Sequence, residues 1–380
     1  MNTENSPILS IIIPTKNRYE TIIPVIEAIT KYIHNSAYEI VIQDNSDDNI
    51  VLLAYLENKK DIRLSYFYTN ESISITDNTD LAVTNAVGKY LIFIGDDDIV
   101  SPNILDFLDL MDKNNIDCLI YNPGYYWWSN VNFTKKTYYH TNNALWIPKN
   151  ISYKLEKLNS EKEIKFMLDN GASGYFKLPR LYHGIVKKEV LEKIREKTGT
   201  YLPGSCPDIA FATALSLTIK DYYYINYPIS IFGASKNSGG GWSVSNKHFG
   251  KIEDQKWLPK NILEKWDPLI PKIWSECTIY PQSVYEVLHA FKVEKKINYT
   301  AFFATMLSRE AHLNKYTLPI LKKYCKNDIR KYLKILILTI KKVGGKFYRN
   351  YKIRSRNLGY SVEIVSDIDH VMKVLNKINI

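Results

Sequence analysis

Strand-like and helix-like hydrophobic patterns alternate along the first 120 residues of the chain. Short apolar or alternating runs predict strands at 8–13, 38–42, 62–68, 90–94 and 117–121. Apolar residues spaced three and four positions apart predict helices between them at 19–33, 50–56, 77–87 and 102–111. This order predicts an α/β fold, with a mostly parallel sheet and helices on both faces.

The pattern is less regular after residue 120. Residues 121–146 are rich in Tyr and Trp and have no clear period, which indicates an irregular excursion. Further on we expect a strand at 181–186, helices at 188–194 and 207–219, a strand at 222–232, and a flexible loop at 233–242. From Trp257 onward the pattern is mainly helical, so we predict a first domain at 1–250 and a helical C-terminal region at 251–380.

The net charge of +10, from 50 basic and 40 acidic residues, is concentrated in one segment. Residues 329–362 hold ten basic residues and no acidic one, and without these ten the chain has 40 of each. Apolar residues of this segment, among them Ile329, Leu333 and Ile340, fall on one helical face. The segment is either an interfacial helix on an anionic membrane or a packed helix with a solvated basic face.

The four cysteines form no Cys-x-x-Cys pair, so neither a zinc knuckle nor a disulfide framework is expected. No run of eighteen apolar residues predicts a membrane span, and residues 1–7 do not have the pattern of a signal peptide. These features favour a cytoplasmic location.

Three predicted strands end in polar clusters, at 14–18, 43–46 and 95–98. Because the carboxyl ends of parallel strands meet at one edge of a sheet, we expect these clusters to lie together and to bind a ligand. The last cluster contains Asp96, Asp97 and Asp98 in succession. Adjacent carboxylates repel each other, which favours a Mg²⁺ or Mn²⁺ site over the alternative of a solvated turn or helix cap.

These segments, in this order, resemble family 2 glycosyltransferases. The resemblance is carried by Pro14-Thr15-Lys16-Asn17-Arg18, Gln43-Asp44-Asn45-Ser46, Ala86-Val87-Gly88-Lys89 through Asp98 with Pro102 following, and Gly204-Ser205-Cys206-Pro207-Asp208. It implies the GT-A fold and a nucleotide-sugar donor, with a donor half at about 1–122 and an acceptor half at about 123–250. Two departures from the family pattern are Gly95, where many members have Asp, and Thr79-Asp80, where an Arg-Asn pair is common.

Carried over to this chain, the resemblance implies a role for each matching residue. Pro14, Thr15 and Arg18 would bind the donor, Asp44 would accept a hydrogen bond from the base, typically uracil, and Asp96 would touch the ribose. Asp97 would bind the metal, with Asp98 as a second ligand or in the outer shell. Asp208 would be the general base, although a helix cap is the alternative for an aspartate at a helix start.

The activity implied is inverting transfer of a sugar from a nucleotide-diphosphate sugar, typically a UDP-sugar, to a glycan hydroxyl. The usual setting is assembly of a bacterial surface polysaccharide such as capsule or O-antigen, on a lipid-linked acceptor at the inner membrane face. Weaker candidates are His248 as a further metal ligand, His183 and Trp242 at the acceptor, and the loop 233–242 as a lid over the donor.

Three other functions would also explain parts of this pattern. A sugar-phosphate nucleotidyltransferase also uses a nucleotide-binding sheet and Mg²⁺, but the segment 14–18 has no glycine. A metal-dependent nucleic-acid protein would use the basic segment, yet its charges lie in one late stretch and not along a groove, so we expect no nucleic-acid partner. A catalytically inactive glycan-binding module would not need both Asp97 and Asp208.

Overall fold

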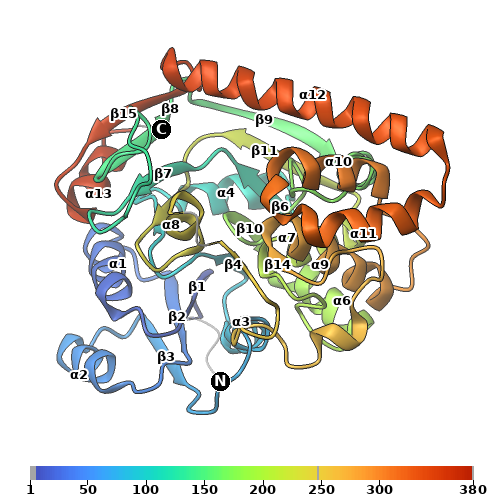
Figure 1. Ribbon diagram of the computed structural model, residues 1–380. Coiled ribbons are helices and arrows are strands. Elements are labelled where there is room, and N and C mark those ends of the chain that lie inside the picture. Colours follow the sequence, from blue (N-terminus) through green and yellow to red (C-terminus); the bar gives the residue numbers. More distant parts are fainter. Residues whose placement is uncertain (1–5, 246–247, 379–380) are drawn as a thin grey trace.

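The computed structural model describes residues 6–245 and 248–378 (Figure 1). Residues 1–5 lie outside the described part of the chain. They belong to the segment 1–7, which was predicted not to be a signal peptide. An eight-stranded sheet forms the centre, in the order β3-β2-β1-β4-β10-β6-β11-β9. Its strands are β1 (Leu9–Thr15), β2 (Tyr38–Asp44), β3 (Leu64–Tyr68), β4 (Tyr90–Phe93), β6 (Cys118–Tyr121), β9 (Ser152–Asn159), β10 (Gly184–Lys187) and β11 (Asp221–Asn226).

The first four strands of this sheet are parallel, as the sequence predicts. Strand β10 is antiparallel to both β4 and β6, while β6 and β11 are parallel to each other. The predicted first strand is in register with the second, from Leu9 opposite Tyr38 to Thr15 opposite Asp44. The carboxyl ends of β1 and β2 therefore lie level, and the residues that follow them share one edge.

Helices cover both faces of the sheet (Figure 1). Ile11 and Ile13 point to a core shared with α1 (Tyr19–Tyr32), α4 (Asp106–Lys113) and α13 (Ile368–Asn376). Ile12, between them, points to the opposite core with α3 (Ile75–Asn85), α6 (Lys188–Thr198) and α7 (Pro207–Thr218). Successive strand residues face opposite sides, so continuous apolar runs are what a doubly covered sheet requires. The predicted α/β fold of the GT-A class is confirmed.

A second sheet, in the order β15-β8-β7-β12-β5, holds the aromatic excursion. Its strands are β5 (Ile99–Val100), β7 (Gly124–Trp127), β8 (Ala144–Pro148), β12 (Ser230–Ala234) and β15 (Tyr360–Ile364). The prediction of one strand over 222–232 is wrong, because the chain leaves the central sheet after Asn226 and enters the second sheet at Ser230. The predicted loop 233–242 is also partly ordered, since it includes the end of β12 and the start of α8 (Gly239–Val244).

The remaining elements are mostly helical. They are α2 (Ile50–Lys59), α5 (Ser160–Asp169), the 3₁₀ turns η2 (Ile262–Lys265) and η3 (Ala311–Leu313), the pair β13 (Phe249–Gly250) and β14 (Trp274–Ser275), α9 (Glu276–Ala290), α10 (Tyr299–Arg309), α11 (Asn314–Cys325) and α12 (Ile329–Arg354). The helical C-terminal region is thus present. It also returns to the first domain, because β15 pairs with β8 and α13 packs on α1. The boundary at residue 250 stays a prediction.

Within residues 6–245 and 248–378, no helix combines the length and the apolar character needed to cross a bilayer.

Candidate active site

The three polar clusters predicted at the strand ends do meet. Thr15, the last residue of β1, donates a hydrogen bond from its hydroxyl to Asp96 Oδ2 at 2.7 Å. Asn78 on α3 reaches the same edge, with its amide donating to the carbonyl oxygens of Thr15 and Gln43 at 3.4 and 3.3 Å. Asn78 was not predicted from the sequence, and its Oδ1 is buried without a hydrogen-bond partner among the described residues.

Arg18 bridges two of the three aspartates. Its guanidinium lies 2.7 Å from Asp96 Oδ1 and 2.9 Å from Asp97 Oδ2, and it donates to Ser235 Oγ at 2.9 Å. Burial opposes the charge on Arg18, but Asp97 and Asp96 outweigh it and raise the pKa of the guanidinium. Burial also raises the pKa of Asp96 to about 7, although Arg18 acts in the opposite direction. Arg18 was predicted to bind the donor, and the structure places it as the counter-ion of the acidic turn.

Asp98 is held entirely by groups of the protein. It is 0% exposed, its Oδ1 accepts from the Gly233 N–H at 2.6 Å, and its Oδ2 accepts from the Gly95 N–H at 2.6 Å and from His183 Nε2 at 2.9 Å. Burial alone would raise the pKa of Asp98, but His183 and the two backbone N–H groups lower it below its ordinary value. Asp98 is therefore an ionised anchor of the turn.

His183 continues this buried chain of hydrogen bonds. Its Nδ1 lies 2.5 Å from Ser230 Oγ, and Tyr121 Oη lies 2.7 Å from the same hydroxyl. Burial lowers the pKa of His183, and its Nε2 donates to the Asp98 carboxylate. The ring is 0% exposed, which rules out the predicted contact with an acceptor. It positions the acidic turn instead.

The end of β12 closes over the acidic turn from the other side. The Ser235 N–H donates to Asp97 Oδ2 at 2.9 Å, and Trp128 Nε1 donates to the Asp97 carbonyl at 2.9 Å. A Cβ on Gly233 would stand 1.6 Å from the Asp97 carbonyl oxygen, so only glycine fits there. The loop after β12, predicted as a lid over the donor, is in this structure a clamp on the aspartates.

The residues of the predicted metal site do not fit a preformed divalent centre. Both oxygens of Asp98 accept from N–H groups, and the guanidinium of Arg18 lies against Asp97. His248 lines a cavity of about 460 Å³ together with Glu276 and Arg309, and Glu276 also acts on Asp208. In the part of the chain that the structure describes, no group of three or more His, Cys, Asp or Glu side chains is arranged to hold a metal ion.

Asp44, the predicted partner of the base, is also 0% exposed. Its Oδ2 accepts from the hydroxyls of Tyr19 and Tyr66 at 2.7 and 3.0 Å, and its Oδ1 accepts from the Ser46 N–H at 2.9 Å. Pro14 is partly exposed beside this network, on β1. Both carboxylate oxygens of Asp44 thus already accept hydrogen bonds from the protein.

Asp208 is the second residue of α7, after Pro207. The N-cap is Cys206, while Asp208 lies in the first turn, where the helix dipole favours a negative charge. Burial raises the pKa of Asp208 to about 7, helped by the charges of Asp98 and Glu276, while a hydrogen bond from Tyr280 acts in the opposite direction. Unlike Asp98, it is a carboxylate whose surroundings disfavour its charge.

Tyr182 links Asp208 to the acidic turn. Burial raises the pKa of its hydroxyl well above the ordinary value, and Asp98, Asp208 and Asp97 add to the rise in that order. The carboxylates from the end of β4 and from the start of α7 thus act on one hydroxyl. The acidic turn and the start of α7 are thus electrostatic neighbours.

Helix α9, which follows the predicted domain boundary, supports the segment that carries Asp208. The Ser205 N–H donates to Glu286 Oε2 at 2.7 Å, and the Cys206 N–H donates to Ser283 Oγ at 3.1 Å. Glu276 and Tyr280, which act on Asp208, belong to the same helix. The sequence analysis missed these residues, since they lie some 70 positions beyond Asp208.

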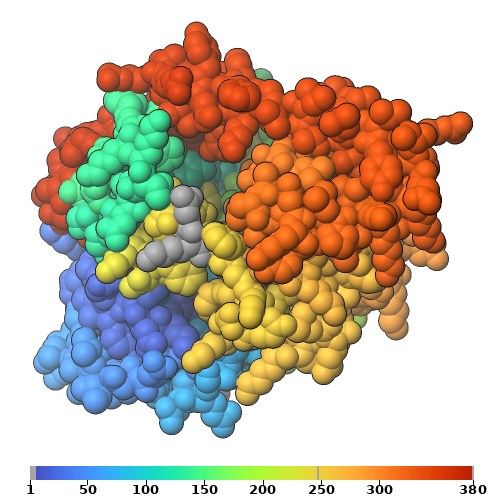
Figure 2. Space-filling model, viewed as in Figure 1, coloured from blue at the N-terminus to red at the C-terminus, as the bar shows by residue number. Residues whose placement is uncertain are grey.

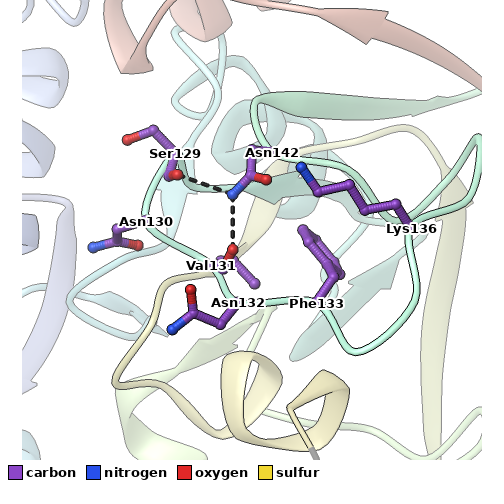
Figure 3. Close-up of a pocket in the computed structure, with 7 residues that line it drawn as sticks. All are labelled: Ser129, Asn130, Val131, Asn132, Phe133, Lys136 and Asn142. Atoms are coloured by element: carbon purple, nitrogen blue, oxygen red, sulfur yellow. Dashed lines mark hydrogen bonds between the residues drawn. The ribbon is translucent and has the colours of Figure 1, made fainter.

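A second cavity, of about 390 Å³, opens in the excursion between β7 and β8 (Figure 3). Side chains of Asn130, Asn132 and Lys136 line it, and Asn142 donates to the backbone carbonyls of Ser129 and Val131.

Trp242, predicted at the acceptor, is half-buried on α8 and packs on Trp257 at a ring distance of 5.4 Å.

Comparison with known proteins decides the family of the N-terminal part. The description "Glycosyl transferase family 2" matches residues 10–178. Residues 10–178 belong to glycosyl transferase family 2. The family 2 region includes the three strand-end clusters on which the resemblance was based, and it ends before Asp208.

Similar proteins cover only part of this chain. An uncharacterised glycosyltransferase of Rickettsia felis is 35% identical over 109 residues, which are 28% of this chain and 18% of that protein. One of Rickettsia conorii is 34% identical over 113 residues, 29% of this chain and 18% of its own length. An uncharacterised protein of Haemophilus influenzae is 26% identical over 147 residues, 37% of this chain and 76% of that protein. The chain thus spans less than a fifth of the two Rickettsia relatives.

Among solved structures, S. aureus TarS 1–349 in complex with UDP-GlcNAc is similar, with a TM-score of 0.43 and 17% identity, over 60% of this chain and 59% of that one. The full S. aureus TarS structure gives a TM-score of 0.42 at 16% identity, over 60% of this chain and 37% of that one. Likeness at this level says nothing about the substrate of this chain.

Proposed function

We propose that this chain is an inverting glycosyltransferase that moves a sugar from a nucleotide-diphosphate sugar to a glycan hydroxyl, with Asp208 as the general base. The observation that carries the proposal is the environment of Asp208. Its pKa of about 7 matches the pH at which a base has to exchange protons, and it belongs to the same cluster as the acidic turn of the family 2 region.

In the proposed reaction, the acceptor side and the donor side of the sugar need different groups. An acceptor hydroxyl attacks the anomeric carbon of the donor while Asp208 takes its proton, and the bond to the diphosphate breaks on the opposite side of the sugar. One displacement of this kind inverts the anomeric configuration. The geometry requires a carboxylate on an element separate from the one that binds the donor, and α7 and the end of β4 supply the two elements.

On the donor side, we propose that the edge formed by Pro14, Thr15, Asp44 and Asp96 takes the nucleoside. A UDP-sugar is the donor that the family resemblance favours. Three aspartates against one Arg18 leave this edge negative, and a diphosphate would be repelled. We therefore propose that binding requires Mn²⁺ or Mg²⁺ that arrives with the donor and is not held in advance by a complete set of protein ligands.

On the acceptor side, a growing surface glycan on a lipid carrier fits the family's usual setting. A cytoplasmic location close to the inner membrane face belongs to the same proposal. The sugar, the linkage and the acceptor are left to experiment.

The test compares Asp208→Asn with a matched variant, Asp109→Asn, which changes an exposed aspartate on α4. Donors are first screened by thermal shift with and without Mn²⁺, because a bound ligand raises the apparent stability. With the best donor, transfer by Asp208→Asn should fall about a hundredfold or more while the donor affinity changes little. Normal turnover in Asp208→Asn, or equal loss in Asp109→Asn, would reject the assignment.

A further inference from the structure

Helix α12 lies on the outside of the molecule and is the longest helix described. It runs along the upper edge in Figure 1, from α11 to the strands β15 and β8, and Figure 2 shows it forming that edge of the surface. Its 26 residues extend about 39 Å at 1.5 Å per residue. A helix of this length offers an extended, nearly straight contact surface.

The inner face of α12 packs on the rest of the protein. Ile335 is 2% exposed and joins the core formed with Phe302 and Phe303 of α10. Near the start of the helix, the Lys331 ammonium donates to the Tyr324 carbonyl at 3.3 Å and lies over the ring of that tyrosine. Near the end, Ile353 packs against the aromatic cluster of the second sheet. The helix is therefore anchored at both ends, and its orientation is fixed.

The outer face carries apolar side chains that this packing leaves in the open. They recur every three or four positions, which is the spacing of one helical face: Ile329, Leu333, Leu336, Ile337, Ile340, Phe347, Tyr348 and Tyr351. Ile329 is 69% exposed and Phe347 is 71% exposed, although they lie eighteen residues apart. The stripe thus runs along most of the helix, outside the face that packs on the rest of the protein.

The charge beside this stripe is of one sign. Arg330, Lys334, Lys341 and Lys352 follow the stripe along one flank, as 100° per residue requires. The helix contains nine basic residues and no acidic one. An apolar stripe with a basic flank is the arrangement that inserts into the headgroup boundary of an anionic bilayer, and aromatic rings such as those of Tyr348 and Tyr351 favour that depth.

We propose that the outer face of α12 docks on the surface of an anionic lipid bilayer. A second copy of the chain is the main competitor, because the apolar spacing would also suit a helix pair. Pairing two such helices would bring nine positive charges on each side together with no acidic side chain on either helix to offset them. An anionic bilayer offers both features at once, because its headgroups neutralise the basic flank and its acyl boundary takes up the apolar stripe. This inference is independent of the proposed glycosyl transfer.

The test is co-sedimentation of the whole protein with phosphatidylcholine vesicles, with and without phosphatidylglycerol. The double variant Leu336→Glu/Ile340→Glu should lower binding to the anionic vesicles at least about tenfold. The matched control Ile62→Glu/Val87→Glu makes the same change of charge at two exposed apolar positions away from α12, and it should bind as the unmodified protein does. The thermal midpoints of both variants report whether they fold.

A second pair of measurements separates charge from apolar insertion and from self-association. Lys334→Gln/Lys341→Gln should weaken binding mainly at low salt, because exposed charges are screened beyond about 8 Å at physiological ionic strength. Without lipid, sedimentation velocity should give the same mass for the unmodified protein and for Leu336→Glu/Ile340→Glu. Equal binding to neutral vesicles, no binding to anionic ones, or a dimer that this variant disperses would overturn the proposal.

Discussion

The acidic turn at the end of β4 and the start of α7 have opposite effects on the charge of an aspartate. The two residues are Asp98 and Asp208. Asp98 accepts hydrogen bonds from Gly95, Gly233 and His183, and its pKa lies below the ordinary value. Asp208 lies close to the charges of Asp98 and Glu276, and its pKa rises to about 7. Burial disfavours the charge of both residues, so their neighbours decide. His183 and two backbone N–H groups favour the ionised form of Asp98, whereas the charges of Asp98 and Glu276 disfavour it at Asp208. The first aspartate therefore holds the site together, and the second has the raised pKa that a general base would need.

The largest effect should come from removing the anchor. Asp98→Ala leaves two backbone N–H groups and the imidazole of His183 buried without their acceptor. We expect the free energy of unfolding to fall by about 3–5 kcal/mol, the usual cost of breaking a buried network of this kind. Urea denaturation measures the loss, and Asp109→Ala on the surface should leave stability nearly unchanged. A loss below about 1 kcal/mol would mean that the turn does not depend on Asp98.

A smaller loss should follow from changing the clamp without touching a carboxylate. Gly233→Ala places a Cβ against the Asp97 carbonyl, so β12 or the turn has to shift. The expected destabilisation is about 1–3 kcal/mol, with weaker donor binding in proportion to the displacement of the turn. Gly174→Ala is the matched control, since nothing lies within 4 Å of its added Cβ. If both variants denature at the same urea concentration, the close contact between Gly233 and the Asp97 carbonyl does not contribute to stability.

The smallest effect should have the opposite sign, and it concerns Asp208. Its raised pKa means that ionisation favours the unfolded chain, so its penalty is absent below about pH 4, grows up to about pH 7 and is constant above. Asp208→Asn removes that penalty but leaves a polar amide in its place, and solvent screens part of the effect because the side chain is partly exposed. We therefore expect the variant to be more stable by about 1 kcal/mol at about pH 8 and by less at about pH 5. Denaturation at both pH values checks this. If Asp208→Asn is less stable than the unmodified protein at the higher pH, the folded state favours the charged form of Asp208.

Much of the fold was predictable from local patterns, because a sheet covered on both faces needs continuous apolar strands. The runs around Ile11 and Ile40 predicted their strands, and polar clusters directly after strands predicted the edge where they meet. The break between β11 and β12 was signalled by Pro228, which cannot donate to a central ladder, but the apolar residues on both sides of it concealed the change of sheet.

The partners of the site residues could not be predicted in the same way. Arg18 and Ser235, or Asp208 and Tyr280, are far apart in the sequence, and nothing in the local pattern of either records the other. His183 was a weaker candidate for the acceptor because it lies near a strand expected at the active site. Its burial and its bond to Asp98 are tertiary facts. The same is true of α9, which lies beyond the predicted boundary and still shapes the environment of Asp208.

The measurement that tests the central claim most directly is the pH dependence of kcat at saturating donor and acceptor. If Asp208 takes the proton, kcat should fall about tenfold per pH unit below about pH 7, since only the ionised carboxylate can act as the base. Donor affinity, measured over the same range, reports any contribution of Asp96, whose pKa is also about 7. A value of kcat that stays constant from about pH 5.5 to 8, in protein that binds its donor throughout, would contradict the account.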